Sequence, residues 1–321
     1  MLIAGAGQLG SRYLQGLRAV SLPLRITACD PVGQSLAVGQ RRWEQASPAV
    51  EHGKPVFVQS LTEAVASLGS ELDAVIVSTD AGHRREVVES IFKTIPVRYW
   101  VLEKLLAQSS SDVRAMLGSI GSPARAFVNT PRRIMAGYAE LRQRLVPPLD
   151  VRVDGGQWGL ASNAVHMIDT VEWLASDVMS DIVISGRSNG WYATKRSGHL
   201  DMTGCMTVAF VRGSRLVMEA HERQARFTVS VTDSLGSRWV IDQNSGVALC
   251  QEGDSTGQEL QVPLEMQSTM TPRIVEELLS TGTCGLPTLE ESARVHIPLL
   301  DELLNHWNSS TGASDTHVPI T

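Results

Sequence analysis

The sequence has few cysteines, and their placement argues against a disulfide-stabilised protein and against a zinc-stabilised one. Four cysteines occur among 321 residues, and no two of them form a C-x-x-C pair. Scattered thiols are typical of the reducing cytosol rather than of a disulfide framework. Zinc sites normally show paired ligand spacing, which is missing from the histidines as well, so we expect no bound metal.

Long apolar runs and basic segments are also missing. No run reaches the roughly 18 apolar residues that a transmembrane helix needs. The first residues form no basic leader with a cleavage site, so we expect a cytoplasmic protein without a membrane partner. Lys and Arg total 28 against 34 Asp and Glu, for a net charge of -6. This acidity argues against a nucleic-acid partner, because nucleic-acid binders usually present a basic face.

Short apolar runs alternate with helical patterns over the first part of the chain, which predicts a doubly wound parallel sheet. The predicted strands are 1–4, 25–29, 56–58, 73–77, 99–102 and 126–128. The predicted helices between them are 8–20, 35–44, 61–68 and 83–92. We therefore expect an N-terminal α/β domain over residues 1–129.

The pattern changes to a period of two after about Asn129, which is typical of a mostly antiparallel sheet. The predicted strands are 151–154, 182–185, 206–211, 216–219, 227–231 and 239–242. The predicted helices are 133–145, 163–174 and 289–307, and residues 309–321 read as a frayed polar tail. We expect a second, α+β domain over residues 130–321.

A glycine-rich motif follows the first predicted strand and opens the first predicted helix. Residues 5–10, Gly5-Ala6-Gly7-Gln8-Leu9-Gly10, match G-x-G-x-x-G. In a βαβ unit, this motif marks a Rossmann domain that binds a dinucleotide, with the pyrophosphate on the free N–H groups of the helix start. Gly5 permits the tight turn, Gly7 lets the backbone approach the phosphates, and Gly10 lets the helix pack on the strand. The alternative is a glycine turn without a ligand.

Asp30 stands at the end of the second predicted strand, about 20 residues after the motif, where a carboxylate accepts hydrogen bonds from the adenosine ribose. It would repel a 2′-phosphate, so we favour NAD over NADP. Without the glycines, an Asp-Pro turn would be the better interpretation, because Pro31 follows.

Four further segments complete a pattern that covers nearly the whole chain. They are Thr79 to His83 after the fourth strand, Glu103-Lys104 after the fifth, Val165-His166-Met167-Ile168-Asp169, and Leu286-Pro287-Thr288-Leu289-Glu290. Together with the glycine motif, their order and spacing resemble the Gfo/Idh/MocA (glucose–fructose oxidoreductase / inositol dehydrogenase) family of oxidoreductases.

The resemblance implies an NAD(P)-dependent enzyme that acts on CH–OH groups. A hydride would pass between nicotinamide and a CH–OH or C=O carbon of a sugar-like small molecule, with Lys104 holding the reacting oxygen. His166 would exchange the proton, and Asp169 would orient the imidazole or bind a hydroxyl. Thr79 and His83 would border the cofactor, and Glu103 would orient Lys104 or contact the cofactor. The active site would lie between the carboxyl edge of the parallel sheet and the His166 helix.

Two positions depart from the family pattern. Leu105 replaces the proline of the Glu-Lys-Pro motif, and Ser162 stands where many members carry an aspartate, four residues before the histidine. Segments around residues 10–17, 103–106, 129–133 and 158–163 resemble a branch associated with surface-polysaccharide and nonulosonic-acid biosynthesis. That branch implies an amino-sugar or sugar-nucleotide substrate, with Arg133 and Asn163 as candidate binding residues.

The resemblance also implies a homodimer or homotetramer formed through the open face of the second sheet. Three alternatives stay open. The two departures favour a non-catalytic NAD(H)-binding sensor or scaffold. A cofactor that is never released would instead point to a net epimerisation. Lys104, His83 and His166 could also be ordinary solvated or helix-packing residues.

Overall fold

The computed structural model describes residues 1–122, 125–185, 190–252 and 255–321. The chain forms two compact units, which are described separately below. Unit 1 comprises Met1–Ala107, Ser111–Asn129 and Glu265–Ala293, and unit 2 comprises Gln108–Ser110, Thr130–Leu264 and Arg294–Thr321. Unit 1 therefore contains a segment from late in the sequence in addition to the residues before position 130.

Unit 1 is built on a six-stranded parallel sheet in the order β3-β2-β1-β4-β5-β6. Its strands are β1 (Leu2–Ala4), β2 (Thr27–Cys29), β3 (Val56–Val58), β4 (Leu72–Val77), β5 (Val97–Leu102) and β6 (Ala126–Val128). This order confirms the predicted doubly wound sheet. Such sheets bind ligands where the strand order reverses, here at the carboxyl ends of β1 and β4.

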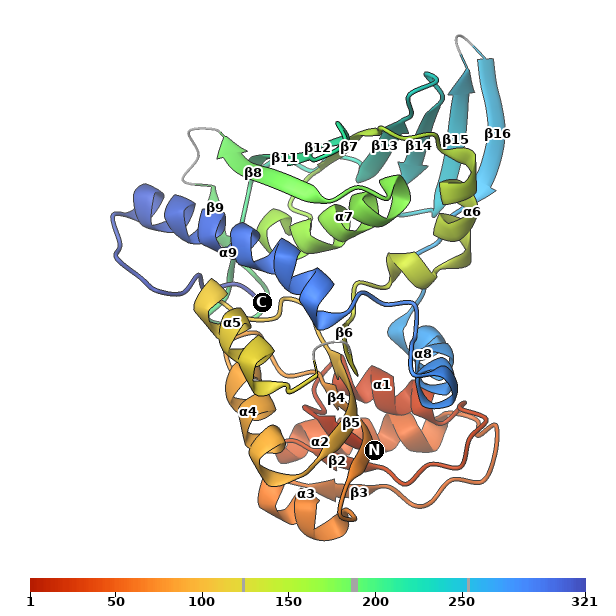
Figure 1. The fold of residues 1–321 in the computed structure, drawn as a ribbon, viewed down its shortest axis with the longest axis vertical. Helices are drawn as coiled ribbons and strands as arrows, with labels where there is room; N and C mark the ends of the chain where they lie inside the picture. Colours follow the sequence, from red (N-terminus) through yellow and green to blue (C-terminus); the bar gives the residue numbers. More distant parts are fainter. Residues whose placement is uncertain (123–124, 186–189, 253–254) are drawn as a thin grey trace. The chain divides into compact units, whose positions relative to one another are not determined.

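The helices of unit 1 are α1 (Gly10–Leu17), α2 (Gly33–Gln45), α3 (Leu61–Ser67), α4 (Arg84–Thr94), α5 (Ser110–Ser119) and α8 (Gln267–Thr281). Both α2 and α8 pack against α1 (Figure 1). The approach of α8 is close, because a Cβ added at Gly16 would lie 2.5 Å from the carbonyl oxygen of Ser268. Helices α5 and α8 were not predicted from the sequence.

Unit 2 is built on an eight-stranded sheet in the order β16-β15-β14-β13-β7-β12-β11-β8. Its strands are β7 (Asp150–Gly155), β8 (Met179–Ser185), β11 (Gly204–Phe210), β12 (Arg215–Ala220), β13 (Thr228–Thr232), β14 (Arg238–Asp242), β15 (Val247–Glu252) and β16 (Ser255–Gln261). The β7–β12 pair is parallel and the other pairs are antiparallel, as predicted for a mostly antiparallel sheet. Strands β9 (Trp191–Ala193) and β10 (Leu200–Met202) form a separate hairpin.

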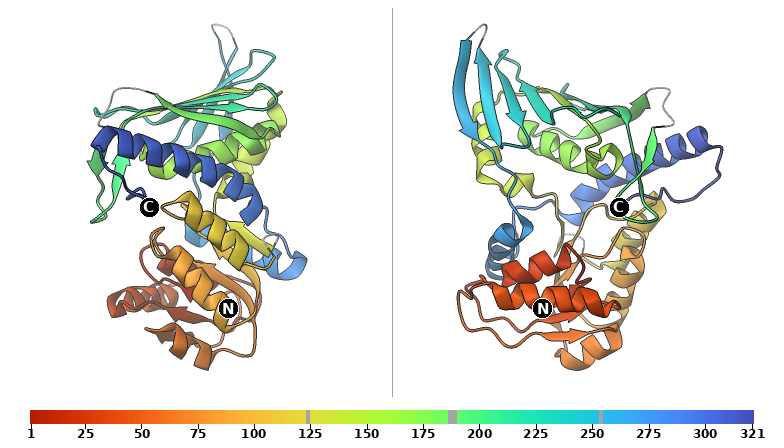
Figure 2. Two further views of the ribbon diagram at one scale, coloured as in Figure 1. Left: turned by 60° about the vertical axis from the view of Figure 1, so that its left-hand side comes forward. Right: turned by 180° about the vertical axis from the view of Figure 1, so that it is seen from behind.

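Helices cover one face of the large sheet. Helix α7 (Leu160–Ala175) and helix α9 (Leu289–Thr311) lie along that face, and the opposite face is open in the described part of the chain (Figures 1 and 2). Burial alternates along β7 accordingly, with Val151 and Val153 buried and Arg152 exposed. This alternation is what a sheet with one covered face requires.

Two local predictions were wrong. The helix expected over 133–145 is divided into η2 (Pro131–Ile134) and α6 (Ala136–Arg144), because Met135 between them is extended. The expected frayed tail is anchored instead: Val318 and Ile320 are fully buried, and the Val318 N–H donates to the carbonyl of Gln108 at 3.0 Å.

Among the described residues, no helix is both long and apolar enough to cross a bilayer.

Candidate functional site

The glycine motif forms the loop between β1 and α1. Gly5 has a φ of +90°, and a Cβ there would lie 2.9 Å from the Thr79 nitrogen. A Cβ on Gly10 would collide with the Gly5 carbonyl oxygen, whereas nothing lies within 4 Å of the Cβ position of Gly7. Gly5 and Gly10 therefore serve the packing of the loop, and Gly7 leaves open space beside the backbone at the start of α1.

Asp30 lies directly beneath this loop and is 8% exposed. Its carboxylate accepts the Ala6 N–H at 2.7 Å and the Val32 N–H at 2.8 Å. It therefore ties the end of β2 to the glycine loop. A carboxylate has about four acceptor positions, so these two bonds leave capacity for ribose hydroxyls.

Arg42, on α2, reaches the same loop and was missed by the sequence reasoning. Its guanidinium donates to the Gln8 carbonyl at 2.8 Å, to the Ser11 hydroxyl, and to the Gln8 side chain at 3.3 Å. Burial, followed by the nearby charge of Arg12, lowers the pKa of Arg42 below its ordinary value. Leu9 completes the loop as the N-cap residue of α1, without a side-chain capping bond. The sequence placed Arg42 in a helix but gave no signal that it faces the loop.

Thr79 lines a cavity of about 380 Å³ at the carboxyl edge of the parallel sheet, together with Gly5, Cys29 and Pro31. Its hydroxyl oxygen is buried and makes no hydrogen bond within the described residues. A buried polar atom without a partner costs free energy unless a ligand or water satisfies it. Thr79 therefore lies where α/β sheets bind ligands, with one buried polar atom unsatisfied among the described residues.

His83 is a predicted cofactor residue that lies at the surface. Its side chain is 72% exposed, and its Nδ1 lies 2.8 Å from Asp80 Oδ1. The hydrogen bond to Asp80, and then the charge of that residue, raise the pKa of His83. His83 is also the N-cap residue of α4, so its observed contacts are those of a helix start.

Glu103 lies at the end of β5 and is only 3% exposed. Its carboxylate accepts hydrogen bonds from the Tyr13 hydroxyl and from the Asn129 amide at 2.6 Å, and the same amide donates to Gln267 at 2.8 Å. Burial raises the pKa of Glu103, while these two bonds and the charges of Arg84 and Lys104 oppose the rise. The Glu103 carboxylate is thus held inside unit 1 by side chains that sequence reasoning had not assigned to the site.

Lys104 follows Glu103 and is half-buried, whereas Leu105 is fully buried. The peptide bond between them is cis. The buried guanidinium of Arg84 donates to the carbonyls of Leu105 and Thr79, and it thereby ties together the segments that follow β5 and β4. Arg84 is a second structural residue of this edge that the sequence did not reveal.

Helix α7 in unit 2 carries three of the predicted residues. Asp169 is buried, and both its oxygens face Arg133, with Nη2 at 2.7 Å and Nε at 3.0 Å. The two residues were assigned separate roles from the sequence, but they form one bidentate ion pair. Asn163 donates to the Trp158 carbonyl at 2.9 Å. His166 lies between Asn163 and Asp169 in the middle of the helix.

Ser162, at the start of α7, stands where the family pattern has an aspartate. A carboxylate does lie beside it, but this carboxylate comes from Asp201 on β10. Asp201 is 2% exposed and accepts the Ala161 N–H at 2.8 Å, the Ser162 N–H at 3.3 Å and the Ser162 hydroxyl. These bonds satisfy the free N–H groups of the helix start. The sequence could not reveal this cap, because it is supplied from 40 residues away.

No protein-family model matches the chain, and a search of curated proteins finds no significant match. Solved structures do match over nearly the full length. Myo-inositol dehydrogenase from Lactobacillus casei, solved with NAD(H) and myo-inositol, has a TM-score of 0.66 at 15% identity and covers 98% of this chain and 94% of its own. UDP-N-acetylglucosamine 3-dehydrogenase GnnA from Acidithiobacillus ferrooxidans has a TM-score of 0.64 at 13% identity, with 94% of each chain covered.

A third match has a different role. The transcriptional regulator Gal80p from Kluyveromyces lactis has a TM-score of 0.69 at 13% identity, and covers 94% of this chain and 87% of its own. Identities this low establish the fold alone. The chain thus has the fold of the Gfo/Idh/MocA-type oxidoreductases, as the sequence resemblance implied.

Proposed function

We propose that the protein is an NAD-dependent oxidoreductase that transfers a hydride between nicotinamide and the CH–OH or C=O carbon of a sugar, an amino sugar or a sugar nucleotide. The observation that carries the proposal is the open space at Gly7, beside the start of α1 and at the point where the strand order reverses. The fold neighbours include dehydrogenases of these substrate classes.

The residues at this edge of the sheet fit a dinucleotide. Gly7 and the start of α1 would receive the pyrophosphate, with positive charge from Arg42 close by. Asp30 would accept the ribose hydroxyls and repel a 2′-phosphate, which favours NAD over NADP. The unpartnered hydroxyl of Thr79 would gain a polar partner. When bound, the nicotinamide gives or takes the hydride.

Lys104 and Glu103 would have different roles in unit 1. The Lys104 ammonium would hold the reacting oxygen and stabilise the negative charge that develops on it. Glu103, enclosed by Tyr13 and Asn129, would fix the end of β5 and so position Lys104. In this proposal Glu103 is a positioning residue rather than a direct contact of the cofactor.

Residues of α7, together with Arg133 on η2, would transfer the proton and bind the substrate. His166 would exchange the proton, since its ordinary pKa lies near neutrality. Asp169 would restrain Arg133, because both carboxylate oxygens are engaged by that guanidinium. Arg133, with N–H groups left over from the pair, and Asn163 would then bind hydroxyl or anionic groups of the substrate. A homodimer or homotetramer in the cytoplasm completes the proposal, and light scattering would measure the number of chains.

A second candidate is a non-catalytic NAD(H)-binding sensor. The likeness in fold to a transcriptional regulator favours it, as do Leu105 and Ser162 at positions where the family pattern has proline and aspartate. The glycine loop would serve a sensor equally well. Lys104 and His166 would then have no role in turnover.

The deciding experiment measures NADH absorbance during incubation with NAD⁺ and a panel of sugars, amino sugars and sugar nucleotides. NADH binding is measured separately by fluorescence. We expect reduction of NAD⁺ by at least one substrate, with Lys104→Ala abolishing it. Lys93→Ala is the matched control, because the Lys93 side chain is 74% exposed on α4. Binding without turnover across the panel would support the sensor. Cofactor that survives dialysis would support the net epimerisation instead.

A further inference from the structure

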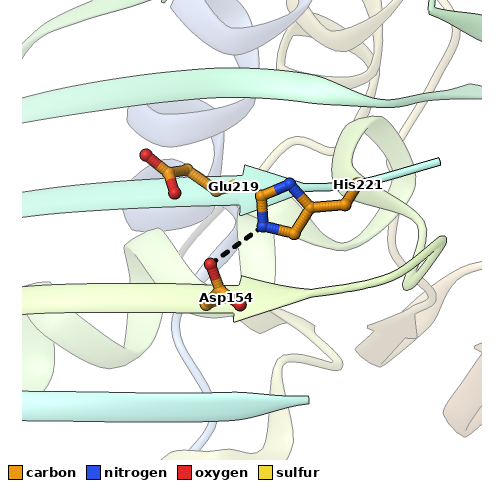
Figure 3. Close-up of side chains that lie close together, drawn as sticks. All are labelled: Asp154, Glu219 and His221. Carbon is orange, nitrogen blue, oxygen red and sulfur yellow. Dashed lines mark hydrogen bonds and ion pairs between the residues drawn. The ribbon is translucent and has the colours of Figure 1, made fainter. Parts of the chain in front are cut away.

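A group of metal-ligand side chains lies on the open face of the eight-stranded sheet, outside the residues assigned to hydride transfer. Asp154 near the end of β7 is paired in parallel register with Glu219 near the end of β12. Side chains two residues apart on a strand point to the same face. The His221 N–H continues the ladder by donating to the Gly155 carbonyl at 2.9 Å. Glu219 and His221 therefore share one face with Asp154, as Figure 3 shows.

The three side chains converge. One ligand atom from each lies within 4.8 Å of the other two, and His221 Nε2 is 3.0 Å from Asp154 Oδ2. Atoms bound to one Zn²⁺ at about 2.0 to 2.2 Å lie about 3 to 4 Å apart, so closure needs movements of about 1 Å. The His221 and Asp154 side chains are 46% and 40% exposed, which leaves them room to move while the paired strands fix their backbones.

The charges of the group favour a cation. Like charges on directly paired strand positions destabilise a sheet, and Asp154 and Glu219 occupy such positions. A divalent ion would replace this repulsion with two favourable contacts. Strand β11 flanks β12 on the side away from β7, and its Cys205 is the register partner of Glu219. A thiol is therefore the next side chain of a metal-ligand type across the sheet from Asp154 and Glu219.

We propose that Asp154, Glu219 and His221 form a binding site for a divalent transition-metal ion of the Zn²⁺ type, which bridges β7 and β12. One imidazole nitrogen and two carboxylate oxygens suit Zn²⁺ or Co²⁺, whereas Mg²⁺ and Ca²⁺ prefer oxygen ligands alone. The site is independent of the proposed oxidoreductase activity, because none of its residues is assigned to hydride transfer.

The test is Co²⁺ and Zn²⁺ titration of the full-length, tag-free protein after treatment with a chelator. We expect one equivalent of Co²⁺ to bind with micromolar affinity and to give a visible absorption band that Zn²⁺ displaces and excess Mg²⁺ does not. Zn²⁺ should also raise the melting temperature of the protein. Absence of saturable Co²⁺ binding would overturn the proposal.

Variants assign the binding to these residues. His221→Gln keeps a donor for Asp154 but loses the imidazole, and Glu219→Gln removes one carboxylate, so each should weaken Co²⁺ binding at least tenfold. The matched controls are His317→Ala and Glu259→Gln, both at exposed positions, which should bind like the unmodified protein. A Cys205→Ser variant that abolishes binding, while His221→Gln does not, would place the ion elsewhere and refute the proposed ligand set.

Discussion

At the scale of single residues, the buried Glu103 makes stability depend on pH. Its pKa is raised by burial, so between the ordinary and the raised value the folded protein keeps a proton that the unfolded chain has lost. The stabilising contribution of the protonated group is therefore present at low pH and lost as the pH rises through the folded pKa. The Tyr13 hydroxyl counteracts this loss by donating to the ionised form.

Replacing Tyr13 with Phe should consequently cost more stability at an alkaline pH, above the raised pKa of Glu103, than at an acidic pH, because only the ionised carboxylate needs the donor strongly. We expect a loss of about 1 to 3 kcal/mol at the alkaline pH. Urea denaturation at the two pH values measures it. An equal loss at both would argue that Glu103 does not change its protonation in this range.

The Arg133–Asp169 pair offers a second test at the residue scale. Removing one member of a buried ion pair costs about 3 to 5 kcal/mol, because the other charge is left unpaired, whereas removing both costs much less. We expect Arg133→Met and Asp169→Leu to destabilise strongly, and the Arg133→Met/Asp169→Leu double variant to lose less than the sum. A double-mutant cycle in urea measures the coupling. Additive losses would mean that the two side chains do not stabilise each other in solution.

At the scale of elements, two glycines of the loop between β1 and α1 have different roles: Gly10 is needed for packing, and Gly7 is proposed to be needed for ligand binding. Gly7→Ala should fold with an unchanged melting temperature, since nothing lies within 4 Å of the new Cβ, yet it should weaken NADH binding at least tenfold. Gly10→Ala should lower the melting temperature, because its Cβ meets the Gly5 carbonyl. Fluorescence titration and thermal melts measure the two effects. Unchanged NADH affinity in Gly7→Ala would remove the main support for the proposed cofactor site.

Elements with strong local patterns were predictable from the sequence. The apolar runs of β4 and β5 and the period-two alternation of β7 are visible in the residues themselves, because burial on two faces or on one leaves a repeating signature. Helix α8 was missed, and its interior contains Pro272, which usually argues against a helix. The continuous helix over 133–145 was wrong because no local signal marks the extended Met135.

The candidate site was predictable only where a motif carried it. The glycine loop, Asp30 and Glu103 follow strands in recognisable positions. The residues that contact the site carry no such signal. Tyr13 is 90 positions from Glu103, and the Asp201 cap of α7 comes from a separate hairpin. Such contacts depend on how elements pack, and single-sequence periodicity contains no information about that.

At the scale of the whole molecule, the end of the chain contributes to stability. A variant that ends after Thr316 loses the buried Val318 and Ile320, each of which contributes about 1.5 to 3 kcal/mol by apolar burial. We expect a clearly lower melting temperature, whereas deletion of Thr321 alone should have little effect. Equal melting temperatures for the two truncations would show that the tail detaches in solution.

Helix α8 packs closely on α1 within unit 1, yet the sheet strands of unit 2 lie between them in the sequence. A ribosome that has made only the first 129 residues has therefore produced a parallel sheet whose α1 surface around Gly16 still lacks its covering helix. That surface stays exposed until translation passes Thr281. Nascent chains should consequently remain sensitive to proteases and attractive to chaperones until α8 has been synthesised and has left the ribosome.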